Sequence, residues 1–145
     1  SLNKRLVPKG LCLLPMRYQG NRALLYLYRP RCLRRDLTND LATEVLSGAG
    51  YQGKSCEQCV ARLMHRLREG QEFPHEVGLF LSYPPEDVKG FIDNRAENFK
   101  CAGLWKVYGD EKRARELFAR YKRCTDIYCA LWRAGSSIEQ LAVPV

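Results

Sequence analysis

Residues 73–94, FPHEVGLFLSYPPEDVKGFIDN, decide the fold, because they predict two short helices joined by a proline corner. Pro74 and Pro85 suit first turns, since proline lacks the N–H that a first turn leaves unbonded. A residue before proline is driven out of the α region, so the first helix should end near Ser82. Helices this short must pack on each other and on further elements. The positions expected to share apolar faces are Val77, Phe80 and Leu81 in the first helix and Val88, Phe91 and Ile92 in the second.

The same corner allows two functional interpretations. It loosely follows a DNA-binding helix-turn-helix, but the second helix would present Pro85, Glu86 and Asp87 to the bases, and two carboxylates repel phosphate. A core-forming corner is therefore favoured. His75 is a candidate catalytic residue, and with Glu76 a candidate metal-binding pair. Adjacent residues point to different sides of a helix and no HExxH spacing follows, so a polar pair in a first turn is favoured.

Positive charge is concentrated at the beginning of the chain. The 145 residues hold 24 Lys and Arg against 16 Asp and Glu, a net charge of +8. Residues 1–35 contain nine of the basic residues and no acidic one. Such a one-sided field attracts phosphate, nucleic acid or an acidic protein. Two other interpretations stay open: a preceding acidic segment neutralises the field, or the charge only keeps the protein soluble.

A β-hairpin is predicted for residues 11–17 and 22–28. Gly20-Asn21 suits a type II′ turn, which needs glycine at its first central position. The register that we expect pairs Met16 with Leu25 and Leu14 with Leu27 on the buried face. The opposite face then holds Arg17, Leu24, Tyr26 and Tyr28.

The most basic run, RPRCLRR at residues 29–35, leaves this hairpin beside its tyrosines. Arginines next to exposed tyrosines are typical of single-stranded nucleic-acid surfaces, where aromatic rings stack on bases. No RRM or KH signature accompanies them. A solvated basic edge that blocks strand aggregation explains the same residues and is favoured. The candidate nucleic-acid residues are Arg17, Arg22, Tyr26, Tyr28, Arg29, Arg31, Arg34 and Arg35.

Three further helices have clear beginnings. Thr38 or Asn39 caps a helix to about Leu46, Ser55 with Gln58 forms a capping box for a helix that ends at Gly70, and Asp110 caps a long helix to Ala134. The long helix should be the spine of the core, with Cys124 buried. Its predicted apolar stripe is Ala114, Leu117, Phe118, Tyr121, Cys124, Tyr128, Leu131 and Trp132.

These elements predict the α+β class. We expect a small antiparallel sheet based on the hairpin, packed by about five helices, with a short strand within residues 101–109. One domain should cover residues 1–145, with a basic N-terminal segment at 1–35 and a mainly helical part at 36–145. No stretch is typical of a membrane span or a signal peptide, so a membrane partner is not expected.

Seven cysteines, at positions 12, 32, 56, 59, 101, 124 and 129, predict reduced thiols and a cytoplasmic location, because the number is odd and the chain can form a core. Cys56 should occupy the first position of its helix, where the helix dipole lowers a thiol pKa. Cys56 and Cys59 form a C-x-x-C pair, but a zinc site needs two further ligands. Inert thiols, redox thiols and metal-ion ligands remain open. The further ligands to consider are Cys101, Cys124, Cys129, His65 and His75.

The phrases HEVGLFLSYPPEDVKGFI, GLWKVYGDEKRARELFARYKRCTDIY and SIEQLAV resemble the bacterial family known as domain of unknown function 3793. The resemblance runs from about Leu11 to Val143 and implies no activity. It singles out Cys101 and Cys124, which lie in or beside these phrases. Members of that family carry further residues ahead of this point, including a His-Cys pair. The chain starts at Ser1 without methionine, so we expect that it lacks an N-terminal segment.

The leading hypothesis is a thiol-dependent protein, either redox or linked to a metal ion or cofactor. Its candidate residues are Cys56, Cys59, Cys101, Cys124 and His75, with Cys56 and Cys59 as candidate metal ligands. The first alternative is a basic module that binds nucleic acid or phosphate through residues 1–35. The second is a structural protein-interaction domain, which a large exposed apolar patch would favour. Walker, GxGxxG, nucleophile-elbow and zincin motifs are absent, so a hydrolase or nucleotide-binding enzyme is unsupported.

Overall fold

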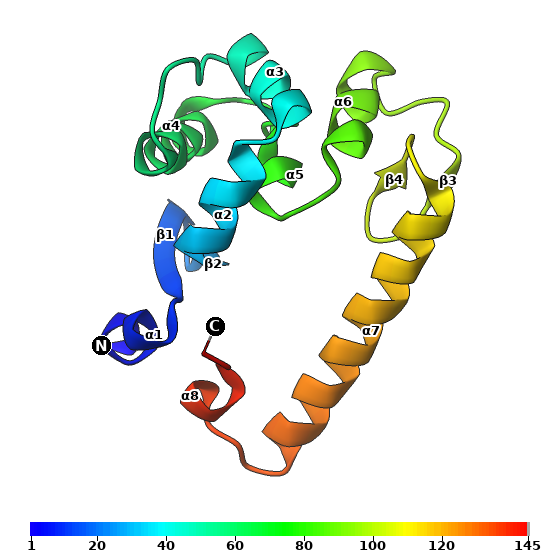
Figure 1. Ribbon diagram of the computed structural model, residues 1–145. Coiled ribbons are helices and arrows are strands. Elements are labelled where there is room, and N and C mark those ends of the chain that lie inside the picture. The colour runs from blue at the N-terminus through cyan, green and yellow to red at the C-terminus, as the bar shows by residue number, and fades with distance from the viewer. Residues whose placement is uncertain (145) are drawn as a thin grey trace.

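The computed structural model describes residues 1–144 and confirms the α+β class, with a long helix towards the C-terminus. Helices α2 to α6 gather beside the hairpin at one end of the molecule, while α7 extends away from them as a long arm (Figure 1). The elements are α1 (Leu2–Leu6), a 3-10 turn η1 (Val7–Lys9), β1 (Cys12–Gln19), β2 (Arg22–Tyr28), α2 (Pro30–Leu37), α3 (Asp40–Gly48), α4 (Cys56–Glu69), α5 (Val77–Phe80), α6 (Pro85–Asp93), β3 (Cys101–Ala102), β4 (Lys106–Val107), α7 (Glu111–Arg133) and α8 (Ile138–Leu141).

The hairpin turns at the predicted residues, but the register that we predicted for its two strands is wrong. Gly20 has a φ of 57°, the left-handed value that its turn requires. Leu14 lies opposite Tyr26 and Pro15 opposite Leu25, and a bulge follows Pro15. The bulge leaves Met16 without a partner on β2, so the pairing changes along the strand.

The buried face of the hairpin is consequently the opposite of the one predicted for β2. Met16 and Tyr26 are buried, whereas Leu25 and Leu27 are each 55% exposed. Tyr26 donates its hydroxyl hydrogen to the Phe80 carbonyl oxygen at 2.5 Å, and its ring stacks on Tyr28 at 4.5 Å. The tyrosine can be buried because its hydroxyl finds a partner, and the leucines take the solvent side.

Residues 30–37 form a helix, α2, whereas the sequence was interpreted as a solvated basic edge in this region. Arg29 is extended and Pro30 takes the first helical position, as proline prefers. Leu33 and Leu37 lie four residues apart and are both buried. The i, i+4 leucines therefore face the core, and the arginines between them point outwards.

The main core lies between the hairpin and helices α2 to α6. Asn39 caps α3 by accepting from the Leu41 and Ala42 amides, and Ser55 with Gln58 forms the predicted capping box of α4. The principal buried members of this core are Met16, Tyr26, Leu33, Leu46, Val60, Leu63, Leu67, Phe80 and Val88.

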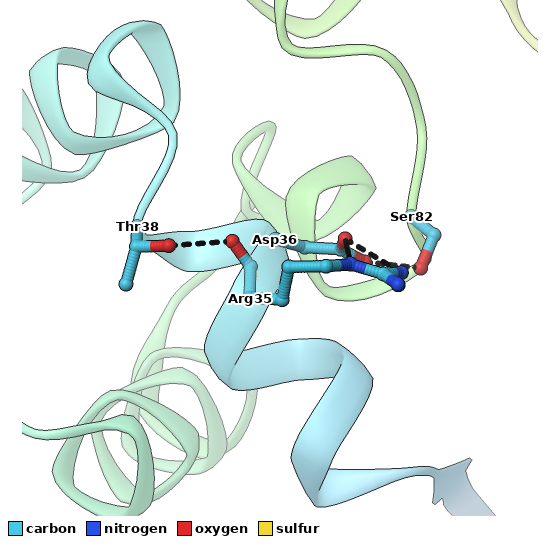
Figure 2. A network of polar contacts seen from close by, with 4 residues as sticks. All are labelled: Arg35, Asp36, Thr38 and Ser82. Carbon is cyan, nitrogen blue, oxygen red and sulfur yellow. Dashed lines mark hydrogen bonds and ion pairs between the residues drawn. The ribbon is translucent and has the colours of Figure 1, made fainter. Parts of the chain in front are cut away.

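The proline corner contains two helices, although the first is shorter than predicted. Helix α5 begins only at Val77, and Leu81, expected on its apolar face, is 46% exposed. Ser82 ends the helix with a φ of 62°. Its hydroxyl donates to Asp36 at 2.7 Å, which joins the corner to the end of α2 (Figure 2). This hydrogen bond stabilises Ser82 in a left-handed backbone conformation, which is unfavourable for most residues other than glycine.

Helix α7 begins as predicted but is not the spine of the core. Asp110 caps it by accepting from the Arg113 amide. Its first turns pack Ala114 and Tyr121 into a second, smaller core around Trp105. Beyond these turns the helix leaves the body (Figure 1), so the second half of the predicted stripe faces solvent. The exposed members are Cys124, Tyr128, Leu131 and Trp132.

The C-terminal segment returns to the beginning of the chain. Glu139, in α8, forms an ion pair with Arg5, and its carbonyl oxygen accepts from Lys9. Arg29 donates to the Lys9 carbonyl at 2.9 Å and to the Val143 carbonyl at 2.5 Å. The two ends of the described chain are thus linked.

Candidate functional site

A cleft of about 830 Å³ lies between the proline corner and the β3–β4 turn. One wall consists of residues of α5 and α6, and the other of residues 102–106. The walls combine many apolar side chains with few polar groups, the usual character of a small-molecule site. This cleft is our candidate functional site.

Stacked aromatic rings form the base of the cleft. The rings of Tyr83 and Trp105 are 4.6 Å apart and tilted by 28°. Phe118, from α7, meets Trp105 edge-on at 4.6 Å. Gly103 allows this contact, because a Cβ there would lie 2.5 Å from the Phe118 ring. Gly78 is constrained in the same way, because a Cβ there would lie 2.8 Å from the Tyr83 side chain.

The carboxylate of Asp87 connects the two walls of the cleft through hydrogen bonds. The carboxylate is 3% exposed and accepts three hydrogen bonds: from the Trp105 indole at 2.7 Å, and from the Tyr108 and Gly109 amides at 2.9 Å. It therefore joins α6 to the residues on both sides of β4. A buried charge needs partners of this kind. Since its oxygens are already bonded, we assign Asp87 a positioning role.

The mouth of the cleft is formed by Phe73, His75 and Leu104. Phe73 is 51% and Leu104 58% exposed, so both present apolar surface to solvent. The exposed His75 ring lies 5.3 Å from Phe91. The Lys106 ammonium group lies near the same ring, with its Nζ 6.0 Å from the Phe91 centroid. The cleft is thus an apolar recess with imidazole and ammonium groups among its lining side chains.

Glu76 points away from its neighbour His75, as predicted from their adjacent positions. It is buried, accepts from the Tyr51 hydroxyl at 2.9 Å and pairs with Arg66 at 2.5 Å. The pair therefore shares no metal site. In the helix-turn-helix interpretation, Asp87 could not contact a base, because it is buried inside the fold, while Pro85 and Glu86 are half-buried.

Cys56 and Cys59 lie at the beginning of α4, as predicted, but their thiols are not activated there. Burial raises the pKa of Cys56, with a further contribution from the charge of Glu57. Burial also raises the pKa of Cys59. Desolvation disfavours the thiolate, and it therefore opposes the lowering of the pKa that we expected from the helix dipole.

The other candidate thiols lie elsewhere in the structure. Cys101, in β3, packs against the second core, and Cys124 is exposed on α7. All seven cysteines are free thiols. Within residues 1–144, no three His, Cys, Asp or Glu side chains are grouped so that they could hold a metal ion.

The candidate nucleic-acid residues differ in exposure and in the partners that they bind. Tyr26 is buried, so its ring is not available to a base. Arg17 donates to the Leu67 carbonyl at 3.2 Å, Arg29 bonds the two chain ends, and Arg34 pairs with Glu57. Arg35 contacts Asp36 (Figure 2). Tyr28 is half-buried, while Arg22 and Arg31 are exposed.

A family model described as Protein of unknown function (DUF3793) matches residues 1–142. The chain belongs to this family. No curated protein and no solved structure matched it in comparison. In the described part of this DUF3793 chain, none of the helices combines the length and apolar character that a membrane span requires.

Sequence reasoning missed the cleft of this DUF3793 chain, although it named several residues that form it. His75, Phe91 and Asp87 were each assigned to a helix, and Trp105 lies in the segment 101–109 that was predicted to contain a short strand. Local periodicity predicts helix faces but not which distant turn meets them. A signal was present in Gly78 and Gly103, each two residues before an aromatic residue, because both glycines allow another aromatic ring to approach closely.

Proposed function

We propose that the chain binds a small organic molecule that carries a flat ring, in the cleft between the proline corner and the β3–β4 turn. The supporting observation is the stacked Tyr83–Trp105 pair at the base of a recess of about 830 Å³. Aromatic rings in offset stacks bind further flat rings with favourable geometry. The exposed Phe73 and Leu104 at the mouth would be covered by such a ligand.

Binding of prodan, a neutral naphthalene dye whose emission shifts to the blue in apolar surroundings, tests this proposal. We expect a blue shift that saturates on titration with protein. Leu104→Ala should weaken binding by about threefold to tenfold, because apolar contact at the mouth is lost. Leu25→Ala is the matched control, since Leu25 is 55% exposed against 58% for Leu104 but lies on the hairpin. Equal loss in both variants, or no saturable shift, would contradict the proposal.

The functions predicted from the sequence remain predictions. The thiol-dependent function remains a proposal for Cys56, Cys59, Cys101, Cys124 and His75, and the burial that raises the thiol pKa of Cys56 and Cys59 favours Cys101 and Cys124 among the cysteines. Nucleic-acid binding would use the exposed arginines Arg22, Arg31, Arg34 and Arg35, and it predicts retention on heparin that decreases with salt. An interaction domain would use the exposed second half of α7. A cytoplasmic location rests on the odd number of cysteines.

A further inference from the structure

Lys106 brings an unpaired positive charge to the cleft. Its Nζ donates to the Ala96 carbonyl oxygen at 2.8 Å and lies 4.7 Å from the centre of the Phe99 ring. None of the ion pairs among residues 1–144 includes it. An ammonium group has three donors, so a carbonyl and the face of a ring leave donors for a ligand.

The carboxylates around the cleft do not balance this charge. Asp87 is the buried one, and its oxygens already accept from Trp105, Tyr108 and Gly109. Glu72 is exposed at the edge of the cleft, where water screens its charge. The lining of the cleft is mainly apolar, and walls of low dielectric constant make the field of the ammonium group stronger than on an open surface.

We propose that the ligand of this cleft is an organic acid with a flat ring, whose carboxylate or similar anionic group bonds Lys106. This inference rests on the proposed function, because it specifies the ligand class of the same cleft. The ring would lie against Tyr83 and Trp105, at one end of the recess. The anionic group would lie near Phe91, where the Lys106 ammonium group and the His75 ring are found.

The test compares naphthoate with naphthamide, which share a ring system but differ in charge, by isothermal titration. The wild-type chain should bind naphthoate about fivefold to tenfold more tightly, the contribution of one partly exposed ion pair. Lys106→Met should abolish this preference while naphthamide binding is retained. Lys100→Met is the matched control: Lys100 also donates to a backbone carbonyl, that of Gly109 at 2.7 Å, but lies outside the cleft. It should leave the preference intact.

A second measurement avoids substitution altogether. Raising NaCl from about 0.05 M to about 0.5 M should reduce the preference of the wild-type chain for naphthoate, because salt screens an ion pair. Equal affinity for the two compounds, or a preference that survives both salt and Lys106→Met, would overturn the inference and leave ring binding standing. Binding of neither compound would overturn the proposed function as well.

Discussion

The buried carboxylate of Asp87 accepts hydrogen bonds from three donors, and the stability of the fold should depend on these bonds. Asp87→Ala would leave the Trp105 indole and two backbone amides without partners, at an expected cost of about 3 kcal/mol. Asp87→Asn should cost less, because one amide oxygen still accepts. Urea unfolding measures both. Asp93→Ala is the control on the same helix, and should cost under about 1 kcal/mol because Asp93 forms an exposed pair with Lys89. Equal losses at the two positions would contradict this assignment.

Thiol reactivity should follow exposure and not helix position. Cys124 and Cys129 are exposed, whereas burial raises the pKa of Cys56 and Cys59 and so lowers their thiolate fraction. At neutral pH we expect a fast phase with Ellman's reagent that disappears when both exposed cysteines are changed to serine. A fast phase that persists in that variant and disappears in Cys56→Ser would restore the original C-x-x-C hypothesis.

Two buried tyrosines should destabilise the fold at high pH. Burial raises the pKa of Tyr26, and burial together with the charge of Glu76 raises the pKa of Tyr51. Above about pH 10 the unfolded chain loses these phenol protons while the folded chain keeps them. Their contribution to stability is therefore complete below that pH and is lost as the pH rises further.

The urea midpoint should accordingly decrease above about pH 10. Tyr51→Phe should make that decrease shallower, although it weakens the fold at neutral pH by removing the bond to Glu76. Tyr18→Phe is the control, because Tyr18 is exposed on the hairpin. An unchanged slope in Tyr51→Phe would show that this phenol does not control the transition.

At the scale of elements, α7 should behave as two halves. Its first turns pack Ala114, Leu117 and Tyr121 against Trp105, but its last turns expose Leu131 and Trp132. A helix without tertiary contacts is marginally stable in water. We expect amide hydrogen exchange to be slow up to about Tyr121 and faster beyond it. Uniform protection along all of α7 would indicate a packing partner for its second half.

The elements differ in how well their own sequences predicted them. Caps at Asn39, Ser55 and Asp110 were found because each is a local hydrogen bond. Helix α2 was missed because we interpreted its arginines as a solvated basic edge and did not use the i, i+4 spacing of Leu33 and Leu37. The hairpin register was wrong because a bulge at Met16 shifts the pairing, and nothing in a strand's alternation predicts a bulge.

At the scale of the whole molecule, Arg29 joins the two ends of the described chain. A lysine cannot reach both the Lys9 and the Val143 carbonyls as a guanidinium does. Arg29→Lys should therefore cost about 1 kcal/mol and increase amide exchange in α8. Arg22→Lys, at the exposed turn of the hairpin, serves as the control. Unchanged exchange in α8 would show that Arg29 does not hold the segment.

The candidate site forms only when distant segments of the chain pack together. The sequence could therefore identify several of its residues but not the cleft that they form. His75 and Asp87 came from the proline corner, and Trp105 from a segment predicted as a short strand. They meet because α6 packs on β4, a contact between residues about twenty positions apart. Helix and strand patterns describe neighbours along the chain, so a cleft between two of them appears only in the fold.

The bonds of Asp87 have one more consequence. Because a single carboxylate joins both sides of the cleft, the spacing between them could widen only if its buried hydrogen bonds to Trp105, Tyr108 and Gly109 were broken. The flat-ring ligand proposed for this cleft would therefore enter by rotation of side chains at the rim and not by a hinge. A cleft of fixed spacing would then select such ligands by their thickness: it would tolerate substituents that extend through the open end and refuse bulk above or below the ring.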